Sequence, residues 1–306
     1  MPTQANTPLP EGSILQKYRI LRVLAVGGFS FVYLAHDEND TPLAIKEYLP
    51  STLALRVNGA RNPQIPAQLP SEDLAMFRAG MKCFFEEAGA IAHLEHPNVV
   101  RVLDFFRAND TVYLVMRYER GRSLQEHIKN RRGALEELWV RNTFAQLLDG
   151  LREVHTHKLL HLDIKPANVY LRTDGSPLLI DFGAARQVLS AEGMKLPSSY
   201  TPGFAPPEMH ARRELLGPWS DIYSVGATMY ACFSAAAPQS AGARLGNDLL
   251  VPASRAFAGK YAPELLEIVD WCLRLDHLQR PQSVLALQKA LLGEMSGQKS
   301  GHRPGK

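Results

Sequence analysis

Short runs of apolar residues, interrupted by turn residues, mark the first 120 positions of the chain. The runs at 18–26, 30–38 and 43–49 are rich in Val, Ile, Leu, Tyr and Phe, and glycine or Asn-Asp turns separate them. Two further runs of the same kind occupy 99–108 and 111–119. Such runs with such turns are typical of neighbouring antiparallel strands. The pattern therefore predicts a small antiparallel sheet.

A helical pattern separates the third of these runs from the fourth. Over 71–96, apolar residues recur at spacings of three and four, as expected for one face of a helix. They are Leu74, Phe77, Met81, Phe84, Phe85, Ala88, Ile91 and Ala92. Residues 50–71, which come before the helix, contain four prolines and an Asn-Gly pair. That composition favours an ordered loop or a small hairpin over a helix.

After Gly121 the pattern is mostly helical, apart from a short hairpin predicted over 168–183. The most apolar run, 222–238, is shorter than the roughly 20 residues that span a bilayer, and it ends at a proline. We therefore expect a buried core helix there and no membrane segment in this chain. The expected fold class is α+β, with a small antiparallel β-sheet lobe carrying one main helix and a larger, mostly helical lobe. We expect a flexible arm at 1–13 and a disordered tail at 293–306.

The composition is that of a soluble globular protein. Of the 306 residues, 45% are hydrophobic and 21% charged, and the net charge of +3 is too small to indicate a nucleic-acid partner. The N-terminus has no apolar segment of the kind found in signal peptides. The three cysteines are far apart and lack metal-binding or disulfide spacing, which suits a reducing, cytoplasmic environment.

The stretch HLDIKPANV at 161–169 contains the residues that phosphoryl transfer needs. Transfer from ATP requires a base that orients the acceptor hydroxyl, a cation near the γ-phosphate and ligands for Mg²⁺. Asp163 is the candidate base and Lys165 the candidate cation, while Asn168 would bind one magnesium ion. Asp181, in the IDFG stretch eighteen residues after Asp163, is the second candidate magnesium ligand. This order and spacing would rarely arise in an unrelated sequence.

Candidate phosphate-binding residues lie in LAVGGFSFVYLA at 24–35. Aligned with the pattern G-x-G-x-x-G-x-V, this stretch places Ala25, Gly27, Ser30 and Val32 at the four pattern positions, with Gly28 beside the second. Only one of the three glycines is in register, and an ordinary Gly-Gly hairpin turn would have the same appearance. The motif is weak evidence by itself.

Lys46 follows three apolar residues in the third predicted strand, so its charge would be largely buried and would need a partner. Glu87, within the predicted helix, is the natural partner. A Lys46–Glu87 pair would direct the ammonium group at the α- and β-phosphates. Glu86 is the competing residue, although it would face another side of the helix.

Together these motifs resemble the eukaryotic-like (Hanks-type) serine/threonine protein kinases, in particular their bacterial members, over residues 14–292. The resemblance implies an N-lobe at about 14–116, a hinge at about 117–121 and a C-lobe at about 122–292. It also implies transfer of the γ-phosphate from ATP, with Mg²⁺, to serine or threonine hydroxyls of protein substrates. Four more residues are implied to lie in the nucleotide site: Ala44, Met116, Glu119 and Tyr170.

Further residues fit the same resemblance. TPGFAPPE at 201–208 is similar to the end of an activation segment, and Thr201 matches the threonine that contacts the catalytic aspartate and lysine in the serine/threonine branch. Glu208 is implied to form an ion pair with Arg280. Asp221 matches the aspartate that supports the catalytic loop.

Two departures from the family pattern concern regulation. Leu162 replaces the arginine that commonly binds a phosphate on the activation loop. We therefore hypothesise that activity does not depend on phosphorylation through that contact, although autophosphorylation of the loop remains possible. The long segment at 50–71 is expected to pack near the helix that bears Glu87, as a docking element, or else to be a surface insertion without function. The alternative to an active kinase is a pseudokinase or a nucleotide-binding scaffold.

Overall fold

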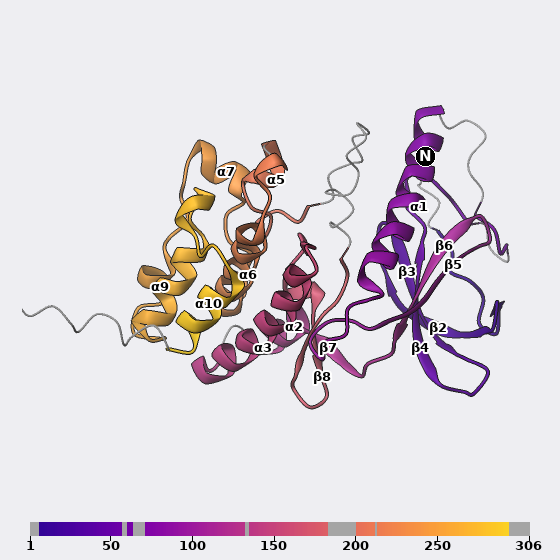
Figure 1. Cartoon of the computed structure of the whole chain (residues 1–306), viewed down its shortest axis with the longest axis horizontal. Helices are drawn as coiled ribbons and strands as arrows, with labels where there is room; N and C mark the ends of the chain where they lie inside the picture. The colour runs from indigo at the N-terminus through magenta and orange to yellow at the C-terminus, as the bar shows by residue number, and fades with distance from the viewer. Residues whose placement is uncertain are drawn as a thin grey trace, which may run out of the picture. The chain divides into compact units, whose positions relative to one another are not determined.

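The computed structural model describes residues 6–56, 60–63, 71–131, 135–182, 200–211 and 213–293, and it divides into two compact units. The first unit contains Met1–Glu95 and Val100–Glu119, and the second contains His96–Val99 and the described residues from Arg120 onward. Figure 1 shows the elements of both units and labels most of them. The boundary between Glu119 and Arg120 falls within the stretch expected to be a hinge. The predicted tail lies outside the described residues, except for Gly293.

The first unit is a six-stranded antiparallel sheet with one long helix. The strands follow the spatial order β1-β2-β3-β4-β6-β5. Their bounds are β1 Ile14–Leu15, β2 Tyr18–Val26, β3 Ser30–His36, β4 Pro42–Tyr48, β5 Val102–Ala108 and β6 Thr111–Arg117. The five predicted strands are confirmed, and the two-residue β1 is an addition.

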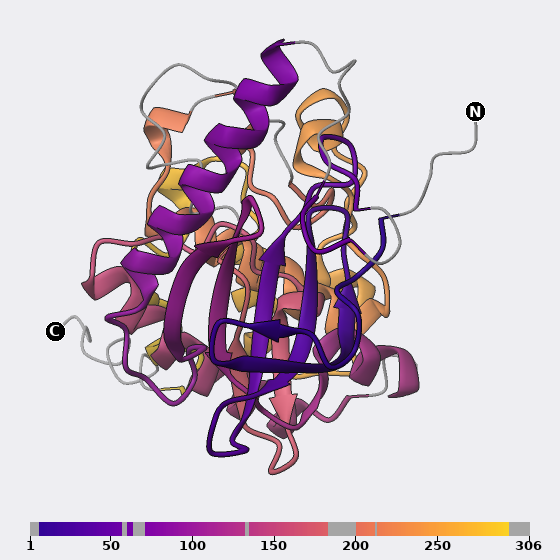
Figure 2. The same ribbon diagram turned by 90° about the vertical axis from the view of Figure 1, so that its right-hand side faces the viewer.

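Helix α1, Ser71–Ile91, contacts β5 and β6, and Figure 2 shows it running alongside the sheet. Its buried residues include Phe77, Phe84 and Ile91, as the apolar spacing predicted. The helix ends at Ile91, five residues before the predicted end at His96. A proline at position 97 disfavours helical backbone in the residue before it, which fits a helix that stops short of this point.

Arg56, in the segment that follows β4, lies on the sheet face opposite α1. Tyr48 and Lys46 point toward α1, since the Tyr48 ring contacts Phe84 and the Lys46 ammonium lies over the same ring. Glu47, between them, points to the other face because side chains alternate along a strand. Arg56 binds Glu47 there and is fully buried. The expectation that this segment packs near α1 is therefore wrong for its residues around Arg56.

Residues 6–9 of the predicted flexible arm are held against this same segment. The Asn6 side chain donates to the Ala54 carbonyl at 2.9 Å and accepts from the Arg56 amide at 2.7 Å. The Thr7 hydroxyl donates to the Arg56 carbonyl at 2.8 Å, and Leu9 is buried. The prediction of a flexible arm is wrong for these residues, because each of these polar groups has a partner about 50 residues away.

The second unit is mostly helical, with a three-stranded sheet of order β7-β8-β9. Its strands are β7 Gly121–Ser123, β8 Val169–Arg172 and β9 Pro177–Leu179, and β8 and β9 form the predicted hairpin. Its helices are α2 Leu124–Arg131, α3 Glu137–Thr156, α5 Glu208–Ala211, α6 Pro218–Ser234, α7 Ala241–Gly246, α8 Ala253–Ala256, α9 Pro263–Cys272 and α10 Val284–Leu291. Short 3-10 turns occupy Pro166–Asn168, Arg213–Leu215 and His277–Gln279.

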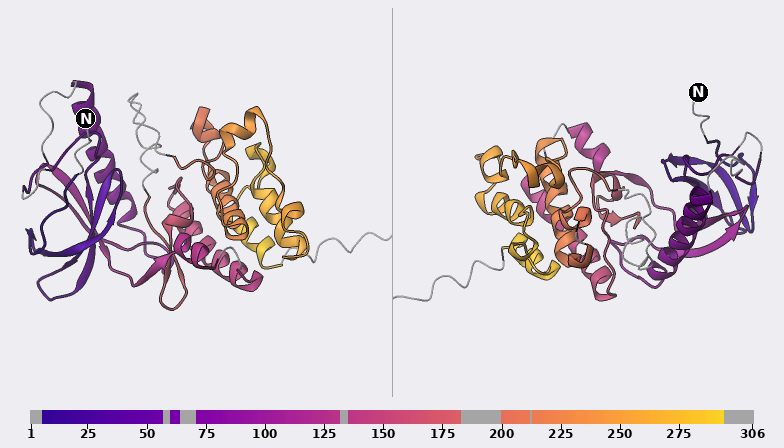
Figure 3. Two further views of the ribbon diagram at one scale, coloured as in Figure 1. Left: turned by 180° about the vertical axis from the view of Figure 1, so that it is seen from behind. Right: turned by 90° about the horizontal axis from the view of Figure 1, so that it is seen from above.

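Helix α6 is the core of the second unit. Every residue from Ser220 to Phe233 is buried, which confirms the predicted core helix as far as Ser234, where it ends four residues before the predicted end at Pro238. Helices α3, α9 and α10 pack against it (Figure 3). Across the described part of the chain, no helix combines the length and apolar character needed to cross a bilayer.

Candidate active site

In the first unit, five predicted nucleotide-site residues share one face of the sheet. Ala25 is opposite Val32, Val32 is opposite Lys46, and Ala44 is opposite Met116. Directly opposed residues point to the same face, and so do residues two apart in one strand. Ala25, Val32, Ala44, Lys46 and Met116 therefore line the face on which α1 also packs.

Lys46 and Glu87 are both buried in this unit, with 8% and 5% of their surface exposed. The Lys46 ammonium lies 5.8 Å from the centre of the Phe84 ring, and Glu87 follows Phe84 by three residues on the same face of α1. Glu86, in contrast, is exposed and pairs with Lys82. Burial thus separates the two glutamates as predicted. The buried face of α1 puts Glu87, and not Glu86, on the side of Lys46.

The turn between β2 and β3 is closed by backbone contacts. The Gly27 amide donates to the Ser30 carbonyl at 2.9 Å. The Gly28 carbonyl accepts two bonds from Ser51, from its amide at 3.0 Å and its hydroxyl at 3.2 Å. Ala25 lies within β2 and Ser30 begins β3, so extended backbone at these positions accepts residues other than glycine. The contact with Ser51 was not predicted from the sequence.

In the second unit, the predicted catalytic residues are hydrogen-bonded to one another. The Lys165 ammonium donates to both carboxylate oxygens of Asp163, at 3.0 and 2.8 Å, and to the Thr201 hydroxyl at 2.8 Å. The Asn168 amide donates to the Asp163 carboxylate at 2.7 Å and to its backbone carbonyl at 2.9 Å. The sequence motifs single out these four residues, and the structure shows how their side chains are bonded to one another.

Asp221 fixes the backbone of this loop from within the core. Its carboxylate is fully buried and accepts from the amides of His161 at 2.9 Å and Leu162 at 2.7 Å. It also bonds the His155 ring at 2.7 Å. Leu162 has a left-handed backbone, with φ of 57°, which is rare for a branched side chain. The two bonds to Asp221 stabilise that conformation just before Asp163.

The electrostatic environment distinguishes Asp163 from His161. Burial raises the pKa of Asp163 above its ordinary value, although the nearby Lys165 ammonium opposes this shift. A carboxylate with a raised pKa is a better proton acceptor. Burial lowers the pKa of His161, whose ring packs at a tilt against Phe182 with centroids 4.4 Å apart. His161 is therefore a neutral core residue.

The residues predicted to bind Mg²⁺ fit a hard cation. The Asn168 amide nitrogen donates to Asp163, which leaves the amide oxygen as the atom suited to a metal. Asp181 is close to this loop, because the Ile180 amide donates to the Asn168 carbonyl at 3.0 Å. The described residues contain no cluster of three His, Cys, Asp or Glu that could hold a metal. A magnesium ion that keeps waters and binds substrate phosphates needs only one or two protein oxygens.

The model of the protein kinase domain family matches residues 69–292, well over half of the chain. The chain belongs to the protein kinase family. Among solved structures, this kinase resembles one titled "PpkA-294 apo form", with a TM-score of 0.82 and 30% identity, covering 94% of this chain and all of that one. The kinase fold expected from the sequence, an antiparallel sheet with a helix followed by a mostly helical part, is confirmed.

The curated relatives of this kinase include two cyanobacterial proteins. Serine/threonine-protein kinase C of Synechocystis sp. is 29% identical over 94% of this chain and 52% of its own length. Serine/threonine-protein kinase PknA of Nostoc sp. is 30% identical over 92% of this chain and 48% of its own. The chain thus spans about half the length of these relatives.

The two remaining predicted site residues, Glu119 and Tyr170, belong to different units. Glu119 follows β6 and is half-buried. Tyr170 is in β8 of the second unit, opposite Ser123 of β7. Residues 183–199, which include the activation-loop hydroxyl residues Ser190, Ser198 and Ser199, lie outside the described residues.

Proposed function

We propose that this kinase transfers the γ-phosphate of Mg²⁺-bound ATP to serine or threonine hydroxyls of proteins. The observation that carries the proposal is the cluster in which Lys165 joins the Asp163 carboxylate to the Thr201 hydroxyl. The same lysine and threonine mark the serine/threonine branch of the family that the sequence resembles. The names of the curated relatives support the same acceptor class.

Each residue of the cluster would have one task. Asp163, with its raised pKa, would orient the acceptor hydroxyl and accept its proton. Lys165 would neutralise the charge that develops on the transferred phosphoryl group. Magnesium, when bound, supplies positive charge that offsets the charge of the phosphate oxygens, and Asn168 and Asp181 would hold it. Lys46, supported by Glu87, would position the α- and β-phosphates.

Purified protein incubated with labelled ATP and magnesium tests the proposal. We expect label on protein and on a serine or threonine peptide with the wild type, and a loss of about 10²- to 10⁴-fold with Asp163→Asn, which removes the base. Nucleotide binding without transfer would instead favour an ATP sensor. Absence of both binding and transfer would favour a scaffold.

We further propose that apolar packing of Leu162 holds the activation segment in place, where an arginine at this position would bind a phosphate on that segment. The Leu162 side chain is 2% exposed and packs with Ala205 and Met209, which follow Thr201 in the chain. Partly buried Tyr200 and Leu216 pack against the same cluster. An arginine at this position would instead require an anionic partner. The apolar contact would hold the segment after Thr201 without phosphorylation.

Substitutions in the activation loop test this role. We expect Ser198→Ala and Ser199→Ala each to keep activity within about twofold of the wild type, since neither phosphate would have an arginine to bind at position 162. Leu162→Ala should lower activity more than either, because it opens a cavity beside Ala205 and Met209. A loss of tenfold or more in a phosphate transfer assay of either serine variant would contradict the proposal.

A further inference from the structure

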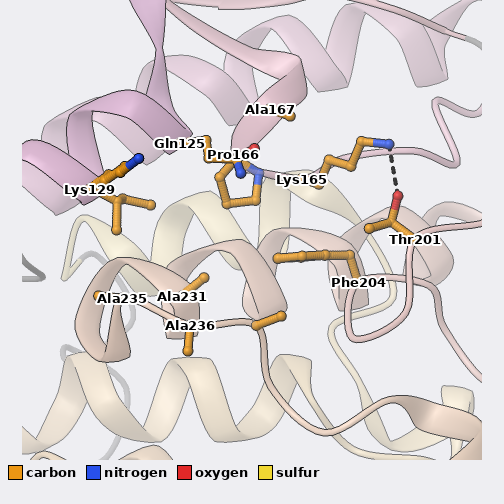
Figure 4. Close-up of a pocket in the computed structure, with 12 residues that line it drawn as sticks. Gln125, Lys129, Lys165, Pro166, Ala167, Thr201, Phe204, Ala231, Ala235 and Ala236 are labelled. Carbon is orange, nitrogen blue, oxygen red and sulfur yellow. Dashed lines mark hydrogen bonds between the residues drawn. The ribbon is translucent and has the colours of Figure 1, made fainter. Parts of the chain in front are cut away.

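A cavity of about 680 Å³ lies beside the catalytic cluster, entirely within the second unit. Figure 4 shows Lys165 and Thr201 toward one end of it and Lys129 of α2 toward the other. This volume is within the range of about 300–1,000 Å³ that binding pockets usually have. Nothing in the proposed chemistry of Asp163 uses this space.

The lining of the cavity is apolar and small. Alanines of α6 and of the turn after it form one side, and Phe204 lies across the space (Figure 4). The apolar lining residues are Ile128, Pro166, Ala167, Phe204, Ala231, Ala235, Ala236 and Ala237. Alanine side chains leave room that a larger apolar side chain of a ligand could fill, with a gain from the area removed from water.

The charges at the cavity have one sign. Lys129 and Lys165 are its charged lining residues, and none of the described lining residues is acidic. Lys165 is engaged with Asp163 and Thr201, whereas Lys129 is exposed on α2 and none of the described acidic side chains lies within ion-pair distance of it. A basic side chain entering the cavity would find no carboxylate. An acidic side chain would find Lys129 at the rim.

The location ties the cavity to the acceptor. An extended peptide advances about 3.3–3.6 Å per residue, so the neighbours of a hydroxyl held at Asp163 lie within about 7 Å of it. Lys165 contacts Asp163 and also lines the cavity. A residue adjacent to the acceptor is therefore the part of a substrate that can reach the space between Thr201 and Lys129.

We propose that this cavity selects the acceptor peptide, which rests on the proposed kinase function. An apolar side chain next to the serine or threonine enters the alanine-lined space, and acidic residues nearby pair with Lys129. Peptides with arginine or lysine at these positions are disfavoured. The specificity-determining residues are then Lys129, Phe204 and the alanines at the end of α6.

Direct binding of labelled peptides tests the proposal independently of catalysis. The peptides carry alanine at the acceptor position, and leucine, serine, glutamate or arginine at each flanking position in turn. Fluorescence anisotropy with the full chain should show leucine binding about tenfold more tightly than serine. Glutamate should bind about threefold more tightly than arginine. Serine peptides that bind as well as leucine peptides would overturn the proposal.

Three variants at exposed positions test whether the cavity is the source of the charge preference among the peptides. Lys129→Glu and Ala236→Glu each place a carboxylate at the cavity and should reverse the preference, so that the arginine peptides bind more tightly than the glutamate peptides. Lys289→Glu makes the same charge change on α10, away from the cavity, and should leave the preference unchanged. An equal change in all three variants, or none in the first two, would overturn the proposal. Preferential binding without phosphate transfer to the matching serine peptides would instead contradict the kinase function.

Discussion

The described residues of each unit include a buried arginine–glutamate pair, and the two pairs differ in the hydrogen bonds around them. In the second unit, Arg280 binds Glu208 through two bonds, of 2.8 and 3.1 Å. In the first unit, Arg56 binds Glu47 through two bonds, one of them 2.8 Å. All four side chains are almost completely buried. Bidentate geometry is the strongest form of such a pair.

In the second unit, the arginine is the member of the pair whose hydrogen-bonding groups are all satisfied. Besides its two bonds to Glu208, the Arg280 guanidinium donates to three backbone carbonyls, so that all five of its N–H groups have an acceptor. These carbonyls belong to Trp219, Arg274 and Leu275. Among the described residues, the hydroxyl of Ser220 is the one further side-chain donor to Glu208, at 2.7 Å. Without Arg280, the carboxylate would keep this one donor from the described part of the chain.

In the first unit, the glutamate is the member of the pair with additional hydrogen-bond donors around it. Glu47 accepts from the hydroxyls of Tyr33 at 2.7 Å and Tyr113 at 2.6 Å in addition to its bonds with Arg56. Burial and the Glu47 charge raise the pKa of both tyrosines, so they remain protonated donors. The comparison indicates that a buried carboxylate depends less on its arginine when neutral hydroxyl groups also donate hydrogen bonds to it. The two arginines should therefore differ in their contribution to stability.

The largest effect is expected for Arg280→Met. Methionine fills part of the same volume but leaves the Glu208 carboxylate buried with one hydroxyl donor, and three backbone carbonyls lose their donor. We expect the free energy of unfolding to fall by about 3–5 kcal/mol, measured by urea denaturation followed by circular dichroism. A decrease in the free energy of unfolding below about 1 kcal/mol would show that the Arg280–Glu208 pair contributes little to stability despite its geometry.

The pair in the second unit could be predicted from the sequence, as could the catalytic cluster. Glu208 and Arg280 are recognisable because they lie in short motifs with fixed neighbours. The same is true of Asp163, Lys165 and Asn168, whose spacing reflects a requirement of the chemistry. Strand and helix patterns also gave the correct order of elements, because apolar periodicity reports which face is buried.

The pair in the first unit could not be predicted in this way. Arg56 is in a proline-rich stretch without periodicity, where an arginine is expected to be exposed. Its burial depends on Glu47 and on residues 6–9, which are close to it only after folding. The bonds from Ser51 to Gly28 likewise join two segments that come close together only after folding. Hydrogen bonds between irregular segments leave no pattern in the sequence.

A smaller effect is expected for Arg56→Met, about 2–3 kcal/mol in the same denaturation measurement. The variant leaves Glu47 buried, but Tyr33 and Tyr113 continue to donate to its two oxygens. Arg61→Met is the matched control, because it removes an exposed arginine from the same segment, and it should change stability by no more than about 0.5 kcal/mol.

The combined variant Arg56→Met with Glu47→Gln separates the charge from the packing. Glutamine carries no charge, and its amide oxygen can accept from one tyrosine hydroxyl while its NH2 group donates to the hydroxyl oxygen of the other. The double variant should therefore be more stable than Arg56→Met alone by about 1 kcal/mol. If the double variant is less stable than Arg56→Met, the tyrosine hydroxyls do not stabilise the buried side chain at position 47 once the arginine is removed. The contrast with Arg280 would then disappear, because both units would depend on their arginine to the same degree.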